Sequence, residues 1–250
     1  MRNYPLSLLL GLTATIALYA PLPAQAQPIL YQNTGGKESF RFDPDGRAVL
    51  ESIGLSVDLE SIESTAEPAP GFSFAFSLLP PSSDPSVRGT TLTFLYDDET
   101  DFYLPLGGTE EFFGNAFFDV DTTKLALEPQ LEIGDFSIRF DSDFNFFVTD
   151  TANTGLRLFD VNSSGNPSID LTTQTWRLEG IDLLISQEFS DFLVAAGASR
   201  PVVGLKILEG QADRSFVEAS STQVPEPGSA LAVLTAASAA LAVGKRRRCT

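Results

Sequence analysis

The sequence of 250 residues contains no histidine, and its only cysteine is Cys249, one position from the end. Without histidine there is no Ser-His-Asp triad and no Cys-His variant of it. The commonest protein ligand for zinc and copper is missing as well. Because residues 27–223 hold no cysteine, this part of the chain has neither a disulfide nor a thiolate metal centre. A segment of this length buries a core without such cross-links.

Basic residues are scarce: 16 lysines and arginines stand against 33 aspartates and glutamates. Between residues 27 and 223, only 11 basic residues face 32 acidic ones. This balance excludes nucleic acid as a partner, because binding to it depends on cations that neutralise phosphates. The acidity is typical of a soluble surface that resists association. It also agrees with weak calcium sites, which extracellular modules use at roughly 10⁻⁴–10⁻³ M.

An uncharged and mostly apolar run extends from Gly228 to Gly244, and Lys245-Arg246-Arg247-Arg248 follows it directly. As a helix this run is about 25 Å long, at the short end of what crosses a bilayer core of about 30 Å. Basic residues after an apolar span favour the cytoplasmic side. We therefore expect one membrane span with a cytoplasmic C-terminus. The alternative is an alanine-rich helix packed on the protein, but such a helix normally carries a polar stripe.

The N-terminus has the pattern of a secretory signal peptide. Arg2 precedes the apolar stretch from Leu6 to Tyr19, and two prolines follow. Ala24 and Ala26 then supply the small residues that a signal peptidase requires, so cleavage is expected before Gln27. The alternative is an anchor that is never cut.

Together the two ends resemble the PEP-CTERM family of exported bacterial proteins. The resemblance rests on Val224-Pro225-Glu226-Pro227, the apolar run after it, and the basic residues 245–248. It implies recognition of the Pro-Glu-Pro motif by an exosortase, a membrane protease-transpeptidase, while the basic residues stop transfer. The chain then divides into a signal peptide (1–26), a passenger (27–223) and a sorting signal (224–250). The latter consists of the motif (224–227), the span (228–244) and the basic tail (245–250).

The passenger alternates apolar and polar residues with a period of two, which predicts β-strands. Turn-forming residues separate these runs, and Asp141-Ser142-Asp143 reads as the loop of a hairpin. The expected strands cover residues 72–78, 90–96, 136–140, 144–148, 156–159, 169–171, 175–185 and 202–208.

One short helix is expected around Phe189–Ala196, where apolar residues recur at helical spacing before Gly197. Residues 49–59 are ambiguous and could form an edge strand. The sequence therefore predicts an all-β passenger with a single short helix, built as an antiparallel β-sandwich or jelly roll. Most of its phenylalanines are expected in the core rather than on an exposed binding face.

Two acidic segments are candidate calcium sites. The first begins at Asp160. Asp160, Asn162 and Ser164 stand at positions one, three and five of an EF-hand-like loop and Gly165 at position six, but the twelfth position, which needs a carboxylate, is Leu171. A plain turn is the competing interpretation. The second crowds four carboxylates into residues 97–101, where a cation would relieve their repulsion; its alternative is a solvated loop. The candidate ligands are Asp160, Asn162, Ser164, Asp97, Asp98 and Asp101.

The functional interpretation is a non-enzymatic protein of the cell surface or extracellular matrix, sorted by an exosortase. Its expected partners are the Sec translocon, signal peptidase, the exosortase, the membrane that holds the precursor, and exopolysaccharide. The alternative is a secreted carbohydrate-active enzyme that uses paired carboxylates about 5–9.5 Å apart. A third possibility is a membrane protein whose tail is never cut. Trp176 and Tyr103 could stack on sugar rings, although the strand around Trp176 favours packing.

Overall fold

The computed structural model describes residues 28–219. The expected signal peptide, the sorting motif, the membrane span and the basic tail lie outside these residues. Ala24, Ala26, Val224–Pro227 and Lys245–Arg248 therefore have no structural description here. Within residues 28–219, no helix combines the length and the apolar character needed to cross a bilayer.

The described residues are mostly β-strand, with two α-helices and one 3₁₀ turn at Leu59–Ser61. The helices are α1 (Pro44–Ile53) and α2 (Gln187–Ala195). The strands are β1 (Ile29–Phe42), β2 (Leu55–Ser56), β3 (Phe74–Leu78), β4 (Thr93–Asp97), β5 (Phe102–Gly107), β6 (Glu110–Phe113), β7 (Asn115–Val120), β8 (Gln130–Gly134), β9 (Ser137–Phe140), β10 (Phe146–Thr149), β11 (Arg157–Ser163), β12 (Ser168–Asp170), β13 (Thr175–Ile185) and β14 (Lys206–Glu218).

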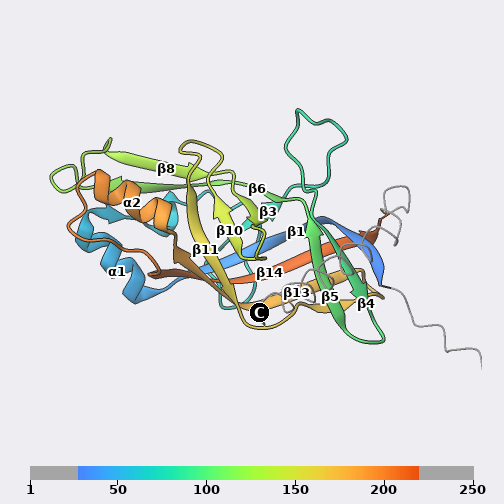
Figure 1. Ribbon diagram of the computed structural model, residues 1–250. Coiled ribbons are helices and arrows are strands. Elements are labelled where there is room, and N and C mark those ends of the chain that lie inside the picture. The colour runs from blue at the N-terminus through green and yellow to red at the C-terminus, as the bar shows by residue number, and fades with distance from the viewer. Residues whose placement is uncertain (1–27, 220–250) are drawn as a thin grey trace, which may run out of the picture.

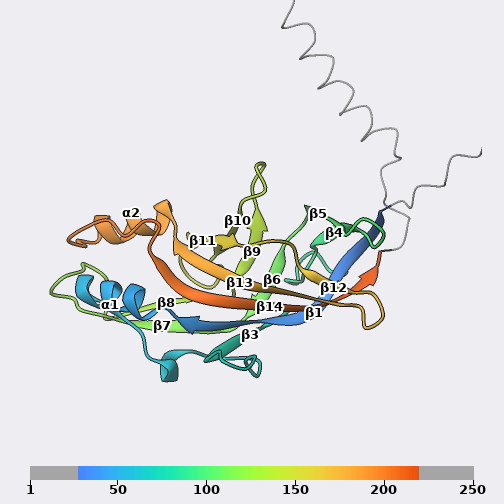
Figure 2. The same ribbon diagram turned by 90° about the horizontal axis from the view of Figure 1, so that it is seen from below.

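Eight of these strands pair in a closed, barrel-like ring in which every neighbour is antiparallel. The order around the ring is β1, β3, β6, β9, β10, β11, β13 and β14, and β14 pairs back to β1. The hairpin β4–β5 adds to the first residues of β1, and β12 adds to the start of β13. The two helices and the small sheet β2–β7–β8 lie at one end of the molecule, and β4–β5 lies at the other (Figures 1 and 2).

The antiparallel, mostly β passenger is confirmed, but the expected sandwich of two facing sheets is replaced by the closed ring. The reason lies in two long strands. β1 has 14 residues and pairs with β4 at its start and with β3 further along, while β14 has 13 residues and pairs with β1 on one side and β13 on the other. A bulge in β1 between Asn33 and Gly35 bends the strand as it passes from β4 to β3. Closure of the ring removes edges that a sandwich would leave open.

The prediction of a single helix was wrong, because α1 was read as an ambiguous segment. Its boundaries are marked locally: the side chain of Asp43 accepts a hydrogen bond from the Gly46 amide at 2.9 Å, and Pro44 opens the first turn. Gly54 ends the helix with φ 107°, a left-handed conformation that favours glycine. Gly46 also brings α1 onto β14, since a Cβ there would lie 1.8 Å from the Lys206 carbonyl oxygen.

The expected helix near Phe189 is confirmed as α2. Ser186 caps it by accepting a hydrogen bond from the Phe189 amide at 3.1 Å. Phe189 and Leu193 then face the core, where they are fully buried. The hairpin across Asp141-Ser142-Asp143 is also confirmed, because β9 and β10 pair across it.

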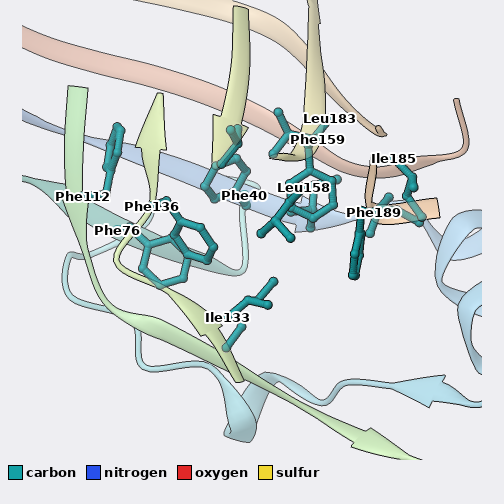
Figure 3. Packing of buried hydrophobic residues seen from close by; sticks show 14 of the residues in the cluster. Phe40, Phe76, Phe112, Ile133, Phe136, Leu158, Phe159, Leu183, Ile185 and Phe189 are labelled. Carbon is teal, nitrogen blue, oxygen red and sulfur yellow. The ribbon is translucent and has the colours of Figure 1, made fainter. Parts of the chain in front are cut away.

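Aromatic residues from widely separated strands fill the ring, as the sequence predicts for most of the phenylalanines. Phe76 packs on Phe136 with ring centroids 5.1 Å apart, and Phe40 packs on Phe74 at 5.6 Å. These side chains converge with Phe112, Phe159 and Leu183 in the interior (Figure 3).

A buried carboxylate fixes the connection between β10 and β11. Asp150 is completely shielded from solvent. One of its oxygens accepts hydrogen bonds from the amides of Gly134 at 2.9 Å and Ala152 at 3.0 Å. The other accepts from the amide and the hydroxyl of Thr154. Asp150 thereby joins the end of β8 to the loop that begins β11.

We expect Asp150→Ala to lower the free energy of unfolding by about 3 kcal/mol, because several buried donors lose a charged acceptor at once. Chemical denaturation followed by circular dichroism measures this loss. Asp143→Ala, in the exposed hairpin loop, is the control and should leave stability nearly unchanged. Equal stability of the two variants would contradict the structural role of Asp150.

Candidate functional site

An arginine lies inside the ring, on a strand face that is otherwise apolar. On β14, Ala212, Arg214 and Phe216 alternate with residues that face outward, and all three are buried. Arg214 retains only 2% of its exposure. A buried charge of this kind needs close partners, because removal of an ion from water is costly.

Five hydrogen bonds from different nitrogen–hydrogen groups satisfy the guanidinium of Arg214. Nε donates to Glu110 Oε1 at 2.8 Å, and Nη2 donates to Glu110 Oε2 at 2.9 Å and to Glu38 Oε2. Nη1 donates to the carbonyl oxygens of Lys37 and Asp213. A guanidinium has five such donors, so none is left over. We call Arg214, Glu38 and Glu110 the buried ionic triad.

Two further side chains extend the triad into a network across the ring. Asn33 donates from Nδ2 to Glu110 Oε1 at 2.7 Å and accepts from Trp176 Nε1 at 2.9 Å. The guanidinium of Arg214 lies 5.3 Å from the centre of the Trp176 ring and 5.1 Å from that of Phe112. Cation–π contacts at these distances are attractive. The network thus joins four strands of the ring: β1, β6, β13 and β14.

Burial shifts the pKa values of the acidic and basic side chains around the cavity in opposite directions. Burial raises the pKa of Glu38 above its ordinary value, although Arg214 beside it acts in the opposite direction. Burial by itself would lower the pKa of Arg214, but Glu110 and Glu38 together raise it, so the arginine keeps its charge. Burial also raises the pKa of Tyr103, which therefore stays neutral.

The ring partly encloses a cavity of about 350 Å³ beside this network, and the exposed Phe144 lies at its opening. That volume falls in the range typical of small-molecule sites, about 300–1,000 Å³. Its walls are mainly apolar and aromatic, and the three members of the ionic triad are its only charged residues. The aromatic wall residues are Phe40, Tyr103, Phe144, Phe146 and Trp176. A smaller hollow of about 30 Å³ lies next to the cavity and shares Glu38 with it. Figure 3 shows part of the wall of the hollow, formed by Phe40, Phe76, Phe112, Phe136, Phe159 and Leu183.

The hairpin between β9 and β10 contributes an exposed aromatic residue to the cavity. Phe144 is 52% exposed and has φ 62°, a left-handed conformation that costs a bulky residue about 1–3 kcal/mol. Asp141 stabilises the turn by accepting from the amides of Asp143 and Asn145. The bond from Asn145 lowers the pKa of Asp141 below its usual range. The ring of Phe144 stacks on Phe140, with centroids 5.6 Å apart.

A second, wider hollow of about 1,200 Å³ is open and polar. It runs along β12, β13 and β14, and polar residues such as Asn166, Thr175 and Asp213 line it. The salt bridge between Arg177 Nε and Asp213 Oδ1, at 2.7 Å, lies in its wall. We consider the enclosed cavity the better site for a small ligand, because a site of this kind needs apolar enclosure around a few polar groups.

The first set of candidate calcium ligands lies on a strand rather than in a loop. Asp160 and Asn162 are on β11, and Ser164 follows it. Asp160 accepts a hydrogen bond from Arg157 Nε at 2.7 Å, so an internal cation already neutralises it.

The second set of candidate calcium ligands lies in the turn between β4 and β5. Asp97 accepts from the amide of Glu99 and the hydroxyl of Thr100, and Asp101 accepts from the Tyr96 hydroxyl at 3.1 Å. Asp98 is exposed. Across residues 28–219, no group of three or more aspartates and glutamates is arranged to hold a metal ion.

The sequence did not predict the buried ionic triad. Trp176 was expected to pack inside the protein, and this is confirmed, since it is buried. A signal for the triad does exist. Glu38, Glu110 and Arg214 each stand two positions before a buried phenylalanine, on the inward face of their strands. A charged residue at a position where the alternation requires a buried apolar side chain is therefore the signal of an interior polar group.

No protein-family model matches the sequence, and no curated protein matches it either. A solved structure that is similar is the C-terminal domain of HtaA from Corynebacterium glutamicum, with a TM-score of 0.38 and 14% sequence identity. The similarity covers 74% of this chain and 99% of that domain. A likeness this weak carries no argument, so the site rests on its geometry alone.

We expect Arg214→Met to lower the free energy of unfolding by about 3–5 kcal/mol, because it leaves two buried carboxylates without their cation. Urea denaturation of the variant and of the unmodified chain measures the difference.

Arg177→Met is the matched control: its side chain is 57% exposed, and its salt bridge should contribute less than about 1 kcal/mol. Adding Glu38→Gln and Glu110→Gln to Arg214→Met should restore part of the loss, because the unpaired charges disappear. A stable single variant would contradict the network.

Proposed function

We propose that this chain is an exported, non-enzymatic binding protein of the cell surface or extracellular matrix, sorted by an exosortase. Its signal peptide directs export, and its C-terminal span holds the precursor in the inner membrane until the Pro-Glu-Pro motif is recognised. The passenger then carries a small, mainly apolar ligand in the closed ring. The single observation that supports binding is the enclosed cavity with the buried ionic triad in its wall.

The arrangement of the two chain ends is compatible with a tethered passenger. The first and last described residues lie side by side, since the Ala219 amide donates to the Leu30 carbonyl oxygen at 2.9 Å. Tyr31 and Glu218 are opposite each other on β1 and β14. The first and last described residues thus lie at the end of the molecule away from the helices (Figure 2).

The enclosed cavity supports ligand binding because most of its wall is apolar and its polar groups are few and fixed. Every donor of Arg214 is already used inside the protein. The triad therefore does not need a ligand to stay folded, and it presents a preformed surface. Preformed sites lose less entropy when they bind.

A second candidate function is the carbohydrate-active enzyme, and one observation favours it. Two glutamates, Glu38 and Glu110, both line a cavity with aromatic walls. However, the same guanidinium holds both carboxylates. A general acid and a nucleophile or base must instead be free to meet the substrate and water. We therefore favour binding over hydrolysis.

Exopolysaccharide and calcium remain proposals for the outer surface. The open polar hollow along β12, β13 and β14 offers hydroxyl, amide and carboxylate groups to a sugar chain. For calcium, the candidate is still the turn that holds Asp97, Asp98 and Asp101, at the weak affinity of extracellular modules.

Sorting is tested in a host that encodes an exosortase. We expect the mature protein to begin at Gln27 and to end near the motif, as mass spectrometry of both ends would measure. Replacing Pro225, Glu226 and Pro227 together by alanine should abolish most of the C-terminal processing and keep the chain in the membrane.

The control replaces Pro80 and Pro81 by alanine, in the exposed loop between β3 and β4. This variant should be processed normally. Unchanged processing of the motif variant would rule out the proposed sorting.

Ligand binding is tested through Trp176, the only tryptophan of the sequence and a wall residue of the cavity. We expect the neutral probe 4-phenylbutan-1-ol to change the fluorescence of Trp176 in a saturable way. Ala212→Phe, which projects a ring into the cavity, should weaken this binding at least about tenfold.

Val217→Phe is the control, because Val217 is exposed on the outer face of the same strand. If Ala212→Phe does not fold, Val161→Phe on β11 fills the cavity from another strand. Equal affinity of the filled and control variants would refute binding in the cavity.

A further inference from the structure

Every nitrogen of the buried network already donates a hydrogen bond, whereas one carboxylate oxygen has no donor. Arg214 uses all five of its donors, Asn33 Nδ2 binds Glu110, and Trp176 Nε1 binds Asn33. Both oxygens of Glu110 accept hydrogen bonds. Of the two oxygens of Glu38, only Oε2 accepts a bond from the described part of the protein. Glu38 Oε1 is therefore an acceptor without a donor in residues 28–219.

This oxygen belongs to a residue that lines both hollows. Glu38 is 3% exposed overall, and it borders the cavity of about 350 Å³ and the smaller hollow next to it. Within residues 28–219, Asn115 Oδ1 is the only fully covered side-chain oxygen or nitrogen without a hydrogen-bond partner, so the unpartnered Glu38 Oε1 retains some accessible surface. A polar ligand group that enters the cavity can thus reach Oε1.

The charge of the cavity wall favours a cation. Two carboxylates share a single guanidinium, and no other charged residue lines the cavity. Ionised, the wall has an uncompensated negative charge on side chains that are themselves buried, where charge interactions are stronger than at the surface. Burial accordingly raises the pKa of Glu38, and a bound cation would offset that effect.

The aromatic wall adds to this preference. The rings of Tyr103, Phe146 and Trp176 line the same space. The face of an aromatic ring attracts an organic ammonium, most strongly when water is excluded. The negative faces of these rings do not attract an anion.

Building on the proposed function, we infer that the cavity selects a small organic cation, namely a primary amine attached to an apolar body. The ammonium group donates to Glu38 Oε1, and the apolar body occupies the aromatic and aliphatic part of the cavity.

Three probes of nearly equal shape test this selectivity: 4-phenylbutylamine, 4-phenylbutan-1-ol and 4-phenylbutanoate. Each is titrated into the full-length chain at pH 7.5 while Trp176 fluorescence is recorded. We expect the amine to bind at least about tenfold more tightly than the alcohol, because a charged hydrogen bond replaces a neutral one. The carboxylate should bind most weakly.

Glu38→Gln should remove the advantage of the amine and bring its affinity to within about twofold of that of the alcohol. Glu111→Gln is the matched control. Glu111 is also a buried glutamate on the ring, but Arg88 and Ser137 hold it and it does not line the cavity. This variant should keep the full preference.

The outcomes distinguish a failure of the proposed cavity site from a failure of the selectivity for an amine. If no probe binds the unmodified chain, the proposed cavity site fails, and the selectivity fails with it. If the alcohol binds as tightly as the amine, the cavity site stands and the selectivity is refuted. An amine preference that survives in Glu38→Gln also refutes it, because the charge then comes from elsewhere. If Glu38→Gln does not fold, the ranking of the probes on the unmodified chain decides.

Discussion

The fold depends on a single buried cation. Arg214 stands on β14, the strand that closes the ring, and its guanidinium reaches Glu38 on β1 and Glu110 on β6. Since a charge inside a protein is stable only with close partners, the ring can close only where these three strands are in register. The ionic triad therefore selects one pairing among the many that alternating strands allow, and the aromatic core then packs around it.

The same constraint produces the cavity. A polar network must be fully bonded or it destabilises the core, and the network here uses Asn33 and Trp176 to satisfy Glu110 and its neighbours. These polar side chains occupy positions that closely packed apolar groups would fill in an ordinary β-barrel core. The space beside them remains open, and a single carboxylate oxygen of Glu38 is left without a partner in the described chain. Stability and binding thus arise from one arrangement.

Some strands, such as β3, β4, β10 and β13, were predictable, but β1, β5 to β8 and most of β14 were not, and neither was the closure into a ring. A strand such as Phe74–Leu78 can be predicted from its own sequence, because large apolar residues alternate with small or polar ones. The pairing of Gln32 with Val217 joins residues from opposite ends of the passenger, and no local pattern encodes such a contact. Glu38, Glu110 and Arg214 lie on strands or parts of strands that were not predicted, so their inward positions were not recognised. Which of the 32 acidic residues of the passenger would meet Arg214 depended on the register. Helix α1 was missed although Asp43-Pro44 and Gly54 mark its two ends.

The central claim is that the interior of the ring is a binding site whose unused acceptor is Glu38. The most direct measurement is a crystal structure of the full-length chain grown with 4-phenylbutylamine. The account predicts the amine nitrogen within hydrogen-bonding distance of Glu38 Oε1, its phenyl ring among the aromatic wall residues, and Arg214 still bound to both glutamates. A probe found only on the outer surface, or an Arg214 turned away from Glu38 and Glu110, would contradict it.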